Sequence, residues 1–217
     1  MCYSKESSLN GYILGVSSSV ILLNSDNESY KHIGLLFLSI SLIQLLEYMI
    51  WSDERCVKWN NIASKLIFVV LSMQVIFLFL GGYLFNTLYI SNNILIGIIC
   101  LIVSFLLYYI IDVFVINKNV LWCTKANKES GHLIWANSDK YLTMSKLLYY
   151  LSYLIVCLLG KNRKVFLLLL LLFILTLVYS KISIMKGMYY SKWCYYGVMI
   201  PVVFIVYDYY DKYLLKK

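Results

Sequence analysis

The chain has 217 residues, of which 61% are hydrophobic and only 14% are charged, and its mean hydropathy is +0.75. Soluble domains typically carry about 25% charged residues, so this composition excludes an ordinary soluble domain and predicts a polytopic membrane protein. The formal net charge of +8 comes from lysines and arginines in loops beside apolar segments. There they can meet lipid phosphates, so we expect a lipid bilayer as partner and no nucleic acid.

Seven apolar segments predict one membrane domain over residues 1–217, an all-α bundle of about seven transmembrane helices. About 20 apolar residues in a helix cross a hydrocarbon core of roughly 30 Å. The first segment is short, but no basic region precedes it, so we interpret it as a retained span rather than a signal peptide. The expected spans are residues 9–23, 32–51, 62–85, 94–116, 142–160, 164–180 and 191–210.

The second segment contains one carboxylate, Glu47, near its far end. An ionisable residue inside a membrane segment is costly and marks a functional site by default. The alternative is that Glu47, about one turn from the end, reaches interfacial water or is protonated against Gln44. Four side chains three or four residues apart lie along one face of this helix, a polar stripe that should face other helices: Ser41, Gln44, Glu47 and Trp51.

Three further residues in the later segments are candidates for the same site. Asp112 lies about one turn from the end of the fourth segment, at a depth comparable to that of Glu47 and on the same side of the membrane. His132 lies in the long loop 117–140, three residues before a tryptophan, where interfacial packing is the alternative. Pro201, the only proline, removes a helix hydrogen bond and predicts a bent, central last helix.

The span count places four cysteines near one face: Cys2, Cys56, Cys123 and Cys194. No CxxC or other metal-ligand spacing is present, so the zinc signal is weak. One or two disulfides are expected if this face is exoplasmic. With the initiator methionine removed, Cys2 would present an amine and a thiol that could chelate a soft metal or cross-link with Cys194. Lysine and arginine are more numerous on the same face, which favours the cytoplasm instead, so the orientation stays undecided.

Short motifs occur in order along nearly the whole chain: Met1-Cys2-Tyr3-Ser4 with Ser7-Ser8, Gln44-x-x-Glu47-x-x-x-Trp51, Gly131-His132, and Ser191-x-Trp193-Cys194 followed by an aromatic residue. In these motifs the chain resembles an uncharacterised family of multi-span membrane proteins of bacteria and large DNA viruses, whose members begin Met-Cys-Phe/Trp-Ser. Tyr3 stands where that family usually has Phe or Trp, and Tyr48 where its bacterial members have Gly. The resemblance implies a multi-span fold and draws attention to Cys2, Glu47, His132 and Cys194, without implying an activity or a cofactor.

These features predict a polar pocket near the cysteine-bearing face that binds or passes a small ligand or ion. One alternative is a non-catalytic structural or interaction protein of the membrane, and a second is an intramembrane metal-dependent hydrolase. Enzyme activity is less expected than binding. Retinal is not expected, because the last span has a lysine, Lys192, only at its beginning. The predicted pocket residues are Ser41, Gln44, Glu47, Trp51, Asp112, His132 and Pro201.

Overall fold

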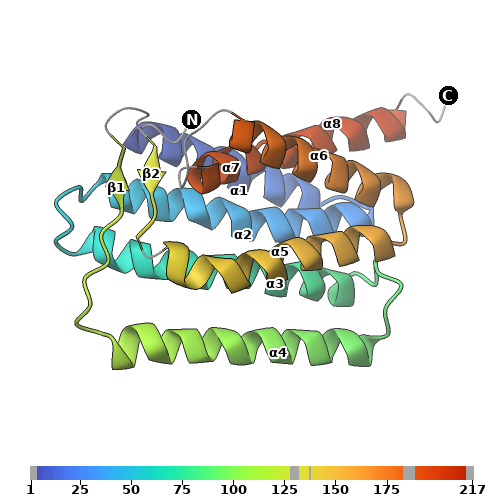
Figure 1. The fold of residues 1–217 in the computed structure, drawn as a ribbon. Coiled ribbons are helices and arrows are strands. Elements are labelled where there is room, and N and C mark those ends of the chain that lie inside the picture. The colour runs from blue at the N-terminus through green and yellow to red at the C-terminus, as the bar shows by residue number, and fades with distance from the viewer. Residues whose placement is uncertain (1–3, 128–131, 137, 183–188, 214–217) are drawn as a thin grey trace.

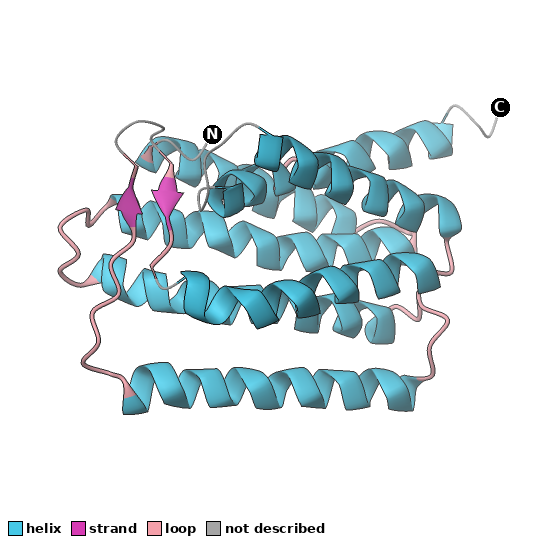
Figure 2. Cartoon of the chain, in the orientation of Figure 1, coloured by secondary structure: helices cyan, strands magenta, loops and turns pink. Residues whose placement is uncertain are grey.

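The structure of the protein, a computed structural model, describes residues 4–127, 132–136, 138–182 and 189–213. It is a bundle of helices with one small antiparallel ribbon (Figures 1 and 2). The ribbon pairs β1 (Lys125–Ala126) with β2 (Leu133–Ile134). The described helices are α1 (Lys5–Leu23), α2 (Glu28–Trp51), α3 (Trp59–Leu84), α4 (Asn92–Ile110), the π-helical turn η1 (Ile111–Ile116), α5 (Ser138–Leu159), α6 (Arg163–Ile182), α7 (Tyr189–Gly197) and α8 (Ile200–Tyr213).

The prediction of a helical protein with membrane-length apolar helices is confirmed. Four described helices are long and apolar enough to cross a membrane, namely α2, α3, the continuous stretch of α4 and η1 (Asn92–Ile116), and α6. A shorter apolar stretch, Leu148–Leu159, lies within α5. Each range predicted as a span overlaps a helix of the structure. Residues 94–116 cover α4 and η1, and residues 191–210 cover α7 and α8.

The prediction that the last segment is one bent helix is wrong. A turn at Val198 and Met199 separates α7 from α8, and Pro201 is the second residue of α8. The amide of Val198 still donates to the carbonyl of Cys194 at 3.3 Å, which closes α7. Proline is tolerated in the first turn of a helix because the amides there have no helical partner. Pro201 therefore begins a new helix instead of kinking an old one.

Helix α2 is the centre of the bundle and α4 lies at its edge. The most apolar stretch of α2 is 67% buried, because α1, α3, α7 and α8 all pack against this helix. The most apolar stretch of α4 and η1 is only 11% buried, and α4 packs chiefly against α3 (Figure 1). An apolar helix that leaves most of its surface open is typical of a helix that faces lipid.

Small residues allow α1 to approach the polar face of α2. A Cβ atom at Gly11 would lie 3.1 Å from the side-chain oxygen of Gln44, and one at Gly15 would overlap the hydroxyl of Ser41. Close approach through glycine and serine is the usual way in which membrane helices pack tightly. The contact buries the polar stripe of α2 inside the protein, as the spacing of its residues predicted.

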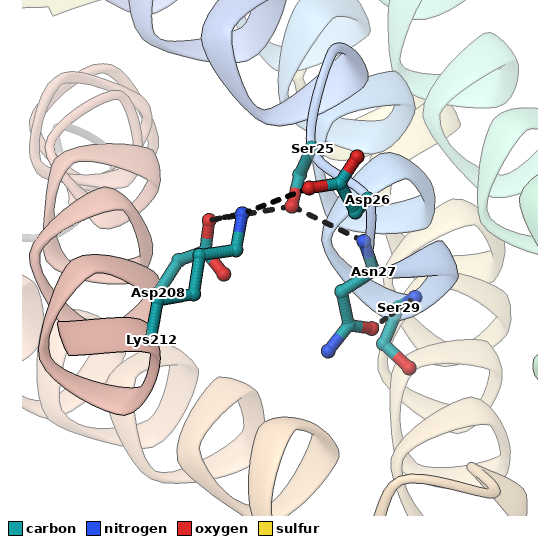
Figure 3. Close-up of polar contacts among 6 residues, drawn as sticks. All are labelled: Ser25, Asp26, Asn27, Ser29, Asp208 and Lys212. Carbon is teal, nitrogen blue, oxygen red and sulfur yellow. Dashed lines mark hydrogen bonds and ion pairs between the residues drawn. The ribbon is translucent and has the colours of Figure 1, made fainter. Parts of the chain in front are cut away.

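The two ends of the bundle are built differently. At the turn end, which we define by the turns α1–α2, α3–α4 and α5–α6, short connections are tied to one another or to α8. Figure 3 shows one such tie, in which Lys212 of α8 lies 3.1 Å from Asp208 and 3.6 Å from Asp26 of the α1–α2 turn. Ser25 donates to Asp208 at 3.3 Å. The opposite end, which contains the α2–α3 loop and the described part of residues 117–136, is called the disulfide end below.

Candidate functional site

Glu47 lies inside the bundle near the disulfide end and accepts two described hydrogen bonds. Its side chain and that of Gln44 are both 0% exposed. The amide nitrogen of Gln44 donates to Oε2 of Glu47 at 3.2 Å, and the indole nitrogen of Trp135 donates to Oε1 at 3.2 Å. Each carboxylate oxygen thus accepts an N–H group of a neighbouring side chain. Glu47 is 0% exposed, which does not fit contact with interfacial water, and it lies beside Gln44, as the other alternative, a protonated carboxyl against Gln44, requires.

The segment that supplies Trp135 crosses the disulfide end as a cover. We call residues 117–136, apart from the undescribed 128–131, the covering segment. Its ribbon is closed by the amide of Asn127, which donates to the carbonyl of His132 at 2.8 Å. Trp122 and Trp135 are both buried, each with 3% exposure. The covering segment therefore packs two tryptophan rings against the helices, and one of them, Trp135, donates its indole N–H to Glu47.

A buried amide pair fastens the covering segment to α3. The side chain of Asn60 donates to the carbonyl of Thr124 at 2.9 Å and accepts from the amide of Thr124 at 3.0 Å. The hydroxyl of Ser64, one turn further along α3, lies 2.7 Å from the hydroxyl of Thr124. These three side chains are at most 2% exposed. Because unpaired buried polar groups are costly, this pairing fixes the position of the segment on the helix.

A disulfide joins the same segment to the α2–α3 loop. Cys56 and Cys123 are bonded, and their Cα atoms lie 5.4 Å apart. The loop is itself ordered by Asp53, whose carboxylate accepts the amides of Lys58 at 2.8 Å and Asn60 at 3.1 Å. These backbone donors hold the pKa of Asp53 below its ordinary value, because they stabilise the charged form. The loop is thus folded at its base as well as cross-linked.

His132 belongs to the covering segment, and its side chain is 1% exposed. Burial, and to a smaller extent the positive charge of Lys192, together lower the pKa of His132 to about 4. Lys192, on α7, is 6% exposed, and its Nζ lies 5.1 Å from the ring centre of Tyr179. His132 is consequently neutral at pH 7 and acts as a buried polar group, close to the position that interfacial packing would give it.

Three other predicted residues, Ser41, Trp51 and Pro201, lie at separate positions on α2 and α8. Ser41 donates to the carbonyl of Phe37 at 2.8 Å and faces α1, where it contacts Gly15. The indole nitrogen of Trp51 is buried and has no hydrogen-bond partner among the described residues. Pro201 is buried in the first turn of α8. Ser41 and Trp51 thus share α2 with Glu47, whereas Pro201 lies on α8, and the described hydrogen bonds of Glu47 come from Gln44 and Trp135.

Asp112 belongs to a different part of the fold. It lies on η1 and accepts from the side chain of Asn117 at 2.9 Å. Helix α3 lies between α4 and α2, so the predicted association of Asp112 with Glu47 has no support in the packing of these helices. The prediction of a shared site is corrected accordingly: the cluster is centred on Glu47 and does not include Asp112.

The described cysteines separate into one bonded pair and three free thiols, two of them buried and one, Cys100, exposed. Cys194 of α7 is a free thiol, 3% exposed. Cys2 lies outside the described residues, and so does any bond between Cys2 and Cys194. Among the described residues, no three histidine, cysteine, aspartate or glutamate side chains are grouped so that they could hold a metal ion.

The most informative residues that sequence reasoning missed are the ones that hold the cover. Asn60 and Ser64 are four residues apart at the start of an apolar helix, a spacing that places both on one face. That signal was available, but it does not name Thr124 as the partner. In the sequence Trp135 is distinguished only as the tryptophan three residues after His132. Its role depends on the path of the covering segment, which no local pattern reports.

Comparison with protein-family models, with curated proteins and with solved structures finds no match to this chain.

Proposed function

We propose that the chain is a polytopic membrane protein of seven spans that binds, and passes, a small cation at Glu47. Four apolar helices of membrane length support the membrane location. The remaining crossings are assigned to α1, α5 and the pair α7 and α8. At 1.5 Å per residue, the 19 residues of α1 and the 22 residues of α5 give helices of about 28 and 33 Å, which match a hydrocarbon core of roughly 30 Å.

The carboxylate of Glu47 carries this proposal. It is 0% exposed, it lies on the most buried of the membrane-length helices, and it accepts hydrogen bonds from Gln44 and Trp135. Placing a carboxylate inside a membrane helix is expensive, and such residues commonly mark the path of an ion or a proton. A cation near Glu47 would offset the cost of burying its negative charge. The resemblance to the multi-span family stays a prediction and supports only the span count.

The test compares two glutamates on the same helix. Glu47→Gln removes the buried charge and preserves the shape of the side chain. Glu28→Gln makes the same change in the exposed first turn of α2, where Glu28 pairs with Lys31 at 2.8 Å. Purified protein is reconstituted into liposomes, and the fluxes of protons, sodium, potassium and calcium are measured separately, together with equilibrium binding of the three metal ions.

We expect the wild type and Glu28→Gln to bind or pass at least one of these cations, and Glu47→Gln to lose that activity while it remains folded in detergent. A Glu47→Gln protein with wild-type flux and binding would overturn the proposal. So would a folded wild-type protein that neither binds nor passes any of the four.

One observation favours a second candidate, a structural protein in which the polar groups hold the bundle together. Glu47 is hydrogen-bonded to the covering segment, which is also attached to α3 through Asn60 and to the α2–α3 loop through Cys56. In that case Glu47→Gln would lower the unfolding temperature far more than Glu28→Gln does. Unfolding measured beside flux separates the two candidates.

A further inference from the structure

We infer that the disulfide end of the bundle faces the oxidising side of the membrane and that the turn end faces the cytoplasm. This orientation is carried by the bond between Cys56 and Cys123 and by the position of exposed basic residues, and it does not require Glu47 to bind a cation. One consequence does rest on the proposed function: the cation would then reach Glu47 from the exoplasmic side, beneath the covering segment.

The disulfide is the first observation. Both of its cysteines lie in connections outside the membrane-length helices, one in the α2–α3 loop and one in the covering segment. Their Cα separation of 5.4 Å falls in the range that a disulfide requires. Disulfides persist in secretory, periplasmic and extracellular compartments and are rare in the reducing cytosol. A stable structural disulfide at one end of the bundle therefore assigns that end to an oxidising compartment.

The fold brings the two thiols together before they are bonded. Thr124, next to Cys123, is paired with Asn60, and the amide of Trp122 donates to the side chain of Asn61 at 2.9 Å. These contacts hold the covering segment against the start of α3, close to Cys56. In bond formation the two thiols lose two protons and two electrons, and a thiol–disulfide oxidoreductase of the oxidising compartment accepts them as its own disulfide is reduced.

Basic residues at the turn end are the second observation. Lys161, in the short turn between α5 and α6, and Arg163 and Lys164, at the start of α6, are all exposed. The positive-inside rule is read from short loops next to membrane helices, and this turn is short and directly precedes α6. Of the other two turns at this end, the α3–α4 turn carries no charged residue and the α1–α2 turn carries only Asp26. The densest exposed basic cluster among the short turns thus marks the turn end as cytoplasmic.

The larger number of lysines at the disulfide end does not contradict this orientation, because several of them are used inside the fold. Lys65 is 4% exposed and donates to the carbonyl of Lys118 at 3.2 Å. Lys192 is buried over Tyr179, and Lys5 lies 5.1 Å from the ring centre of Tyr48. Contacts of this kind also engage basic residues at the turn end, where Lys161 donates to the side chain of Asn86 at 2.7 Å, so the disulfide, rather than the total count of basic residues, carries the orientation.

The experiment labels cysteines from one side of the membrane. Intact cells that express the full chain with Cys100→Ser are treated with a membrane-impermeant maleimide carrying a mass tag, before and after an impermeant reductant. The control adds Ser91→Cys, since Ser91 is exposed at the start of α4 on the turn end and makes no side-chain hydrogen bond to cap the helix. Labelling of Cys56 and Cys123 is read by mass spectrometry of peptides.

We expect Cys56 and Cys123 to be labelled in intact cells only after reduction, and Ser91→Cys to be labelled only after the membrane is permeabilised. Labelling of Cys56 and Cys123 without reductant would show free thiols and overturn the inference. Labelling of this pair only in permeabilised cells, or of Ser91→Cys in intact cells, would overturn it as well. No cation is involved in these readouts, so a failure of the Glu47 experiment leaves the orientation standing, and the reverse is also true.

Discussion

The indole nitrogen of Trp135 donates to the carboxylate of Glu47 at 3.2 Å, although the two residues are 88 positions apart in the chain. The contact joins the covering segment to the central helix at the point where that helix carries its buried carboxyl group. A hydrogen bond to a charged group contributes more than one between neutral groups. The pair therefore couples the closure of the disulfide end to the state of Glu47.

Trp135→Phe removes the donor and keeps most of the ring. We expect a loss of about 1–3 kcal/mol in the free energy of unfolding, because a buried carboxylate then lacks one of its hydrogen bonds. Denaturant unfolding in detergent measures it. The matched control is Trp59→Phe, in which the replaced ring is 50% exposed and which should change stability by less than about 0.5 kcal/mol. Equal losses in the two variants would show that the bond to Glu47 contributes nothing specific.

Gly15→Ala tests the close contact between α1 and α2. The added Cβ would overlap the hydroxyl of Ser41 and lie 3.2 Å from Cβ of Val198, so we expect overpacking to cost about 1–3 kcal/mol. Gly97→Ala on α4 is the control, because a Cβ there meets nothing within 4 Å. Alanine is the better helix former by up to about 1 kcal/mol, so this control should be neutral or stabilising. A stable Gly15→Ala protein would contradict the packing of α1 against the polar stripe.

The double variant Cys56→Ser and Cys123→Ser opens a link between residues separated by 67 positions. Cross-links of this kind typically stabilise a protein by about 2–4 kcal/mol, and we expect a loss of that size in denaturant unfolding. A reducing agent should lower the stability of the wild type and leave the double variant unchanged. If reduction affected both proteins equally, the effect would come from another thiol.

His132 makes the stability of the covering segment depend on pH. Its pKa is about 4 in the folded protein because the ring is buried, whereas an unfolded histidine has a pKa of about 6.5. Between these values the unfolded chain binds the proton more readily, so the contribution of His132 is present above about pH 6.5 and is lost as the pH falls toward 4.

The size of this contribution is on the order of 2–3 kcal/mol. We expect His132→Gln to show a smaller fall in stability than the wild type between pH 7 and pH 4.5, measured by denaturant unfolding at each pH. Other titrating groups act in both proteins and cancel in the comparison. Parallel pH profiles would mean that His132 is not buried as a neutral ring.

The helical, membrane-type character of this protein and the polar face of its second helix follow from the sequence alone. Apolar content, segment length and a spacing of three or four residues are local properties, because they depend on the rise and turn of a single helix. Gln44 and Glu47 share one face for that reason and hydrogen-bond to each other in the structure. That the chain crosses the membrane seven times remains a prediction.

Only the tertiary structure decided what lies against that face. Trp135 reaches Glu47, Thr124 pairs with Asn60, and Cys123 bonds to Cys56 because the covering segment folds back across the disulfide end. Pro201 begins a helix instead of bending one, since the turn before it lets the chain change direction. Partners far apart in sequence are selected by the path of the chain and by the need to satisfy buried polar groups, neither of which is recorded in the spacing of neighbouring residues.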